Sequence, residues 1–181
     1  MYKIGHVVLE VAHGPLSYAD LTSGGRGCTG SEQAMLYLAQ AQAGQGHQVV
    51  MYLPTDTPGF KNGVEMLDVR PAWPRLRRLD GADVVISWLT ADPLRRLSAK
   101  PLKIHSLQIN DWLLCGYGYD AYVDVFVACT ESHKKHLLSE PVAPTNGHFE
   151  IVPNGTFVDR FSGLGPRVPR KCVYLSSPDR G

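Results

Sequence analysis

Residues 24–32 read Gly24-Gly25-Arg26-Gly27-Cys28-Thr29-Gly30-Ser31-Glu32, a glycine-dense loop that runs straight into a helical pattern. Glycine lacks a Cβ, so such a loop can adopt positive φ angles and bring its backbone close to a ligand. Thr29 and Glu32 have the spacing of a capping box, in which a hydroxyl and a carboxylate satisfy amides at the start of a helix. Apolar residues then recur at helical spacing up to Gly44, so the sequence predicts a helix over Ser31–Ala43.

The start of this helix is a candidate anion site, because free amides and the positive end of the helix dipole attract a phosphate or a carboxylate. A tight turn that only caps a core helix is the other interpretation. The loop also has the Gly25-x-Gly27-x-x-Gly30 spacing of a dinucleotide fingerprint. That fingerprint needs its glycines directly after the first strand and an acid about 20 residues later. Here a long connection precedes the glycines and no acid follows the second strand until Asp56, so nicotinamide binding is disfavoured.

Short apolar, β-branched runs alternate with helical patterns along the chain. The predicted strands are Ile4–Leu9, Gln48–Leu53, Glu65–Val69, Asp83–Ser87, Leu102–Leu107, Asp124–Ala128 and Phe149–Val152. The predicted helices are Ser31–Ala43, a short one near Arg75–Leu79, one near Asp92–Ala99, and Glu131–Leu138. Several strands lack period-two alternation, as strands covered on both faces do. The pattern predicts an α/β protein with a doubly wound, mainly parallel, Rossmann-like sheet of about seven strands and helices on both faces.

Composition and charge limit the class of protein. With 181 residues, of which 44% are hydrophobic and 19% charged, the chain can bury a core of its own. A net charge of +1 gives no reason to expect nucleic-acid binding. Met1 leads directly into a strand without a signal peptide, no apolar run is long enough to span a bilayer, and the four cysteines lie far apart without a Cys-x-x-Cys pair. We therefore expect a cytoplasmic protein with no metal and no cofactor.

Ligands of parallel sheets bind beyond the carboxyl ends of the strands. The segment after the fifth predicted strand, Gln108 to Trp112 and on to Asp120, mixes aromatic, amide and carboxylate side chains. Aromatic faces stack on sugar rings and short polar side chains bind hydroxyls, so this segment is a candidate site for a carbohydrate or another small polar ligand. The other interpretation is a polar loop whose aromatic side chains fold back onto the core. His105, inside the strand, is expected to be a core histidine.

Several motifs together resemble glycosyltransferase family 4. They are the glycine loop running into Ser31-Glu32, the Ala-Gly-Gln-Gly-His helix end at residues 43–47, and Ile151–Gly155 followed by Asp159-Arg160-Phe161. Residues 162–170 have the Gly-, Pro- and Arg-rich composition of a linker, and residues 171–181 resemble the first strand and donor loop of that family's second domain. The resemblance implies an N-terminal, acceptor-side domain over residues 1–161, a linker over 162–170, and the opening of a missing donor-binding domain over 171–181.

The resemblance implies the GT-B architecture and transfer of a sugar from a nucleotide-sugar donor to a carbohydrate or other hydroxyl acceptor, usually with retention. It places the donor diphosphate against the glycine loop, where the matching residues are Gly25, Arg26, Gly27 and Gly30, together with Arg180. An arginine is well suited to bind phosphate. Without the second domain, most donor contacts are missing, so the 181-residue chain alone is expected to be inactive.

The resemblance places the acceptor against the N-terminal domain, where the fifth-strand loop is the candidate site. Gln108, Asn110 and Trp112 are the candidate acceptor-binding residues, and Asp111 is the candidate catalytic residue that positions or deprotonates the hydroxyl. Basic residues on the predicted helices could contact the inner face of a membrane, although the near-neutral charge favours ordinary solvated helix faces. A non-catalytic sugar- or phosphate-binding module of the same fold is the alternative from another functional class.

Overall fold

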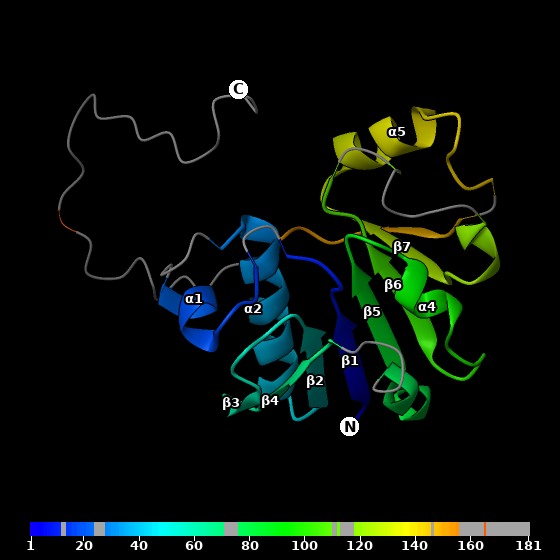
Figure 1. Ribbon diagram of the computed structural model, residues 1–181. Helices are drawn as coiled ribbons and strands as arrows, with labels where there is room; N and C mark the ends of the chain where they lie inside the picture. The colour runs from blue at the N-terminus through cyan, green and yellow to red at the C-terminus, as the bar shows by residue number, and fades with distance from the viewer. Residues whose placement is uncertain are drawn as a thin grey trace.

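The computed structural model describes residues 1–11, 14–23, 28–70, 76–109, 112, 118–145, 147–155 and 165. In this part of the chain, an eight-stranded, mostly parallel sheet packs against helices in an α/β fold (Figure 1). The strands are β1 (Lys3–Val7), β2 (Gln48–Leu53), β3 (Gly59–Lys61), β4 (Val64–Asp68), β5 (Val84–Trp88), β6 (Leu102–Ser106), β7 (Val125–Ala128) and β8 (Phe149–Ile151). The helices are α1 (Tyr18–Ser23), α2 (Gly30–Gly44), α4 (Asp92–Arg95) and α5 (Glu131–Ser139), with 3-10 helices η1 (Arg77–Gly81) and η3 (Tyr119–Ala121).

The strand order is β3-β4-β2-β1-β5-β6-β7-β8. Every neighbouring pair is parallel except β3 and β4, which form an antiparallel hairpin. From β1 the chain builds outward to one side through β2 and β4, and it then returns to add β5 on the other side of β1. The carboxyl ends of β1 and β5 therefore form the topological switch point, where open parallel sheets bind their ligands.

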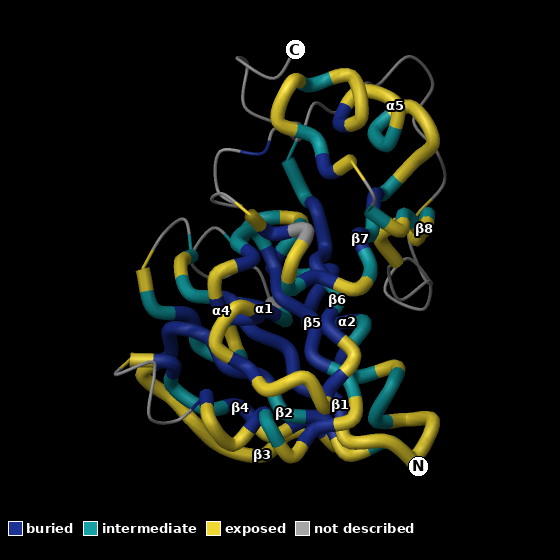
Figure 2. Tube along the Cα trace, turned by 90° about the vertical axis from the view of Figure 1, so that its right-hand side faces the viewer, coloured by how far each residue is buried: buried dark blue, intermediate teal, exposed yellow. Residues whose placement is uncertain are grey.

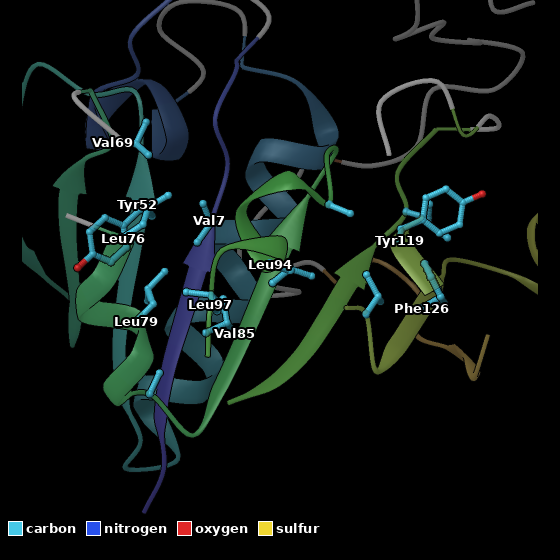
Figure 3. Close-up of a cluster of buried hydrophobic side chains, with 14 of the residues drawn as sticks. Val7, Tyr52, Val69, Leu76, Leu79, Val85, Leu94, Leu97, Tyr119 and Phe126 are labelled. Carbon is cyan, nitrogen blue, oxygen red and sulfur yellow. The ribbon is translucent and has the colours of Figure 1, made fainter. Parts of the chain in front are cut away.

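Two hydrophobic clusters hold this sheet between its helices. One cluster joins Met35 and Leu36 of α2 to buried side chains of β1, β2 and β4. The other cluster joins β-strand residues such as Val85 to η1 and α4, and Figure 3 shows it on the side of the sheet away from α2. In Figure 2 the central strands are accordingly dark blue, whereas much of α5 is exposed. Burial on both faces explains why these strands lack a polar alternation.

Gly5 of β1 lets η1 approach the sheet closely. A Cβ built on Gly5 would lie 2.2 Å from Cδ2 of Leu79, which is itself 1% exposed. Because Gly5 has no side chain, Leu79 can pack directly against the backbone of β1.

All seven strands predicted from the sequence are present, with ends shifted by at most a few residues, and so are the helices predicted over 31–43 and 131–138. The helix predicted near Asp92–Ala99 already ends at Arg95, and the one near Arg75–Leu79 is the 3-10 helix η1. The prediction missed α1 and the short strand β3. β3 is joined to β4 by Asn62 and Gly63, which both have positive φ, of 49° and 79°. Asn-Gly with two positive φ angles is the preferred two-residue hairpin turn, so the sequence did carry a signal for this hairpin. Apart from Gly165, the predicted linker and second-domain opening at 162–181 lie outside the described residues.

Candidate functional site

The N-terminus of α2 is closed by the predicted capping box, which the structure confirms. The Thr29 hydroxyl accepts from the Glu32 backbone N–H at 3.4 Å, and the Glu32 carboxylate accepts from the Thr29 N–H at 2.6 Å. Glu32 is only 4% exposed. The helix thus begins with a buried carboxylate at the positive end of its dipole, which is a favourable position for that charge.

Burial and the nearby Glu32 carboxylate together disfavour ionisation of the neighbouring Cys28 thiol. Burial, followed by the negative charge of Glu32, raises the pKa of the Cys28 thiol to about 12. The thiol is therefore protonated at neutral pH and is a poor nucleophile. Gly30 forms the first turn of the helix, whereas Gly25, Arg26 and Gly27 lie outside the described residues. The anion site expected at this loop stays a prediction.

The backbone turns sharply at the switch point, directly after β5. The Thr90 N–H donates to the Trp88 carbonyl at 2.9 Å, which makes Leu89 the centre of a three-residue turn with φ of 68°. The Ser87 hydroxyl closes the same turn by donating to the Thr90 carbonyl. A leucine with positive φ is uncommon and costs backbone strain, and such strain concentrates at functional sites. Nothing in the local sequence signals this conformation.

Beside that turn, three side chains from three elements form a directed hydrogen-bond chain. The Trp88 indole N–H donates to His6 Nδ1 at 3.1 Å, and His6 Nε2 lies 2.7 Å from Gln42 Oε1. Because an indole nitrogen can only donate, His6 Nδ1 must be unprotonated, and Nε2–H then donates to the amide oxygen. Burial lowers the pKa of His6 to about 4, which keeps this neutral form at physiological pH. The NH₂ group of Gln42 is thereby oriented away from His6.

Gln108, a predicted acceptor-binding residue, lies just past the carboxyl end of β6 and joins two other segments. Its Nε2 donates to the Ser106 hydroxyl oxygen at 2.9 Å, and its Oε1 accepts from Asn154 Nδ2 at 3.0 Å. Asn154 belongs to the Pro-Asn-Gly turn that follows β8, 46 residues further along the chain. The sequence predicted Gln108 at the carboxyl end of a strand, but it did not predict this contact with Asn154.

The start of the fifth-strand loop is held by a histidine that sequence reasoning did not single out. His133 Nδ1 accepts from the Cys129 backbone N–H at 3.2 Å, and His133 Nε2 lies 3.0 Å from the Ile109 carbonyl. These two contacts together require the tautomer with a proton on Nε2. The loop that contains the candidate acceptor residues is therefore anchored to α5 where it leaves the sheet.

Trp112 lies in the core and does not present a stacking face at the rim. Its side chain is 4% exposed, stacks on Tyr119 with ring centroids 5.1 Å apart, and meets Phe126 edge to face. The indole N–H donates to the Leu137 carbonyl at 2.9 Å, so its one polar atom is also satisfied. Trp112 therefore folds back onto the core, which was the second interpretation of this loop, and its ring is not available to stack on an acceptor.

Several other predicted site residues cannot be placed. Asn110, Asp111 and Arg180 lie outside the described residues. His105 is placed, and it is a fully buried core histidine as predicted, with its ring edge-on to Phe126. Burial lowers the pKa of His105 to about 4.

A cavity of about 400 Å³ opens between α2 and the carboxyl halves of β5, β6 and β7. Its walls are mainly apolar, with Leu38 of α2 facing Ile104 and Val127 of the sheet. Its lining includes Gln42 and Trp88 of one hydrogen-bond chain, Ser106 and Asn154 of the other, and Tyr37 of α2. No charged side chain lines it within the described residues. The cavity has the size and the lining typical of a small-molecule site.

In the part of the chain that the structure describes, no cluster of three or more histidine, cysteine or acidic residues could hold a metal ion. Among the same residues, no helix combines the length and the apolar character needed to cross a bilayer. Comparisons with protein-family models, with curated proteins and with solved structures found no match to this chain.

Proposed function

We propose that this chain is the acceptor-side domain of a glycosyltransferase of the GT-B type, with a doubly wound, Rossmann-like fold similar to that of family 4. One observation carries the proposal. One cavity is lined by α2, the helix that begins at the capping box, and by Ser106 and Asn154, which Gln108 joins by hydrogen bonds. An anion-attracting helix end next to neutral groups that bind hydroxyls is the pairing that a nucleotide-sugar and an alcohol acceptor require.

In the proposed reaction, the acceptor hydroxyl oxygen forms a bond to the anomeric carbon of the donor sugar, with overall retention of configuration. The bond from that carbon to the diphosphate oxygen breaks, and the nucleoside diphosphate leaves with the electron pair. Asp111 accepts or orients the hydroxyl proton, while Gln108 and Asn110 position the acceptor. Backbone amides of the glycine loop, Arg26 and Arg180 offset the negative charge that grows on the diphosphate.

The donor-binding half of this enzyme would follow residue 170 in a second domain. Most contacts to the nucleotide belong to that half in this proposal, so the 181-residue chain should bind the donor weakly and should not transfer sugar. Peripheral contact with the inner face of a membrane, through basic residues on the helices, belongs to the same proposal.

The test compares two reactions of the full-length enzyme. Asp111→Asn should reduce transfer to the acceptor on the order of 10²-fold and should affect donor hydrolysis by water much less, because water needs no positioning by the loop. Glu65→Gln, an exposed change on β4, is the control for nonspecific effects on folding. An equal fall in both reactions would assign Asp111 to the donor or to stability. Unchanged transfer would remove it from the acceptor site.

A non-catalytic binding module for a sugar or a phosphate is the second candidate. The rim side chains that the structure describes next to the cavity are amides and a hydroxyl, which bind ligands without acid-base chemistry. This candidate predicts that the chain binds a simple sugar or inorganic phosphate in calorimetry, and that the full-length protein transfers no sugar from any nucleotide-sugar offered.

A further inference from the structure

We propose that the cavity between α2 and β5–β7 binds the apolar body of an uncharged alcohol, and that this alcohol is the sugar acceptor. The assignment of an acceptor role rests on the proposed function, whereas the binding of the alcohol does not depend on it. The ligand class follows from three features of the cavity: its apolar walls, the direction of its hydrogen bonds, and its position relative to α2.

The walls fit a hydrocarbon and disfavour an ion. Ile104 and Val127 are half-buried at the floor, and Val152 at the edge is 46% exposed, so apolar surface is still available to a ligand. Covering that surface would contribute about 25 cal/mol for each Å² removed from water. A carboxylate or phosphate placed there would lose hydration without gaining an ion pair, because the described lining has no charged side chain.

The hydrogen bonds at the rim end in a hydroxyl donor for which no described residue is the acceptor. The Asn154 amide donates to Gln108, and the Gln108 amide donates to the Ser106 oxygen, so the Ser106 hydroxyl proton must find another partner. Ser106 is 4% exposed and lines the cavity, and no described residue accepts that proton. A buried hydroxyl without an acceptor is costly, and an alcohol oxygen on a ligand would satisfy it.

On the opposite wall, formed by α2, the polar side chains are Gln42 and Tyr37, and the orientation of the Gln42 amide is fixed by a hydrogen bond. Gln42 accepts from His6 through its oxygen, so the two N–H bonds of its amide are the groups that it can offer to the cavity. The Ser106 hydroxyl on one wall and the Gln42 amide on the other are therefore both oriented to donate to the cavity. A ligand whose polar atoms are oxygens, such as an alcohol or an ether, is complementary to them, and a protonated amine is not.

The cavity also lies where an acceptor would be needed. Ala34, which lines it, is four residues after Gly30, and four residues of α-helix rise by about 6 Å. The Ala34 end of the cavity thus lies roughly one helical turn from Gly30, where the loop proposed to bind the donor diphosphate enters the helix. This arrangement predicts that acceptors with an apolar body are preferred over free sugars.

The binding test uses the 181-residue chain and N-phenyl-1-naphthylamine, an uncharged apolar fluorophore, with 1-dodecanol as competitor. Val127→Glu places a charge on the cavity floor and should weaken binding of both by about 10-fold or more. Val142→Glu is the matched control, because Val142 is 51% exposed and lies outside the cavity, and it should leave binding unchanged. Ala41→Phe, at an exposed helix position that lines the cavity, should block binding by volume without risk to the core.

The polar part of the assignment has its own readout. Ser106→Ala should weaken the binding of 1-dodecanol by about 5-fold and should leave the binding of dodecane nearly unchanged, since only the alcohol gains the hydrogen bond. Dodecanoate should bind at least about 10-fold more weakly than dodecanol.

The proposal would be overturned if the fluorophore did not bind, or if Val127→Glu and Val142→Glu bound it equally well. It would also be overturned if the chain self-associated in sedimentation and Ala41→Phe abolished the self-association, because a second copy would then cover the cavity. Alcohol binding without sugar transfer by the full-length protein would leave the site standing and refute only the proposed function.

Discussion

The two buried histidines predict a steep acid sensitivity of folding stability. Burial lowers the pKa values of His6 and His105 from 6.5 to about 4. Between these values the unfolded chain binds protons that the folded chain does not. The stability contributed by the neutral histidines is therefore complete above pH 6.5, and it is lost as the pH falls towards 4.

The magnitude follows from the size of these pKa differences. One pKa unit corresponds to about 1.4 kcal/mol, so each histidine contributes up to roughly 3 kcal/mol, of which about 1.3 kcal/mol is lost between pH 7.5 and 5.5. Together His6 and His105 should lower the free energy of unfolding by about 2.5 kcal/mol over that interval. This is a large share of the 5–15 kcal/mol typical of a domain.

The assay is urea unfolding of the wild type and of His6→Gln at pH 7.5 and 5.5. The wild type should show the full loss and the variant about half of it, because one buried titrating group remains. His105→Gln is the second variant, in case the first does not fold at pH 5.5, and it should also halve the loss. If both variants keep the full wild-type loss, the acid sensitivity arises from other groups and the argument from burial fails.

Two further predictions concern the glycine at the start of the sheet and the acid at the start of α2. Gly5→Ala should lower the free energy of unfolding by about 1–3 kcal/mol, because the new Cβ meets Leu79, whereas Gly81→Ala, with open space around it, should change it by less than about 0.5 kcal/mol. Glu32→Gln should tighten inorganic phosphate binding at the loop by a few fold in calorimetry, because it removes a like charge and keeps a capping side chain. An unchanged phosphate affinity would place the anion site away from this helix.

Regular elements of the fold could be predicted because their causes are local. Thr29 and Glu32 mark the start of α2 in the sequence, and their reciprocal hydrogen bonds are present in the structure. The runs that became β2 and β5 are short and mainly apolar without a polar alternation, as is typical of strands buried on both faces. The Asn62-Gly63 hairpin was missed although it has a local signal, because three exposed residues make a strand too short to show a hydrophobic pattern.

Trp112 could not be placed from the sequence because its position depends on distant residues. A tryptophan that follows a strand end can cover a ligand or fold back, and the spacing along the chain is the same in both cases. The outcome was decided by an aromatic pocket contributed by Tyr119, Phe126 and Phe149, and by the Leu137 carbonyl near the end of α5, which accepts the indole N–H. Burying the large ring there gains more than exposing it at the rim, since its N–H also finds a partner.

The contact between Gln108 and Asn154 shows what topology adds to motif reading. Both residues follow strand ends, but β6 and β8 are separated by β7, and two strand spacings amount to about 10 Å. The two side chains meet because residues 152–155 continue from β8 along the border of the cavity, where the Val152 N–H binds the Ala128 carbonyl at the end of β7. The segment that brings Asn154 to Gln108 also supplies one wall of the cavity. The hydrogen-bonded rim and the apolar cavity therefore both depend on the path of residues 152–155, and a change that displaces this segment should disrupt both together.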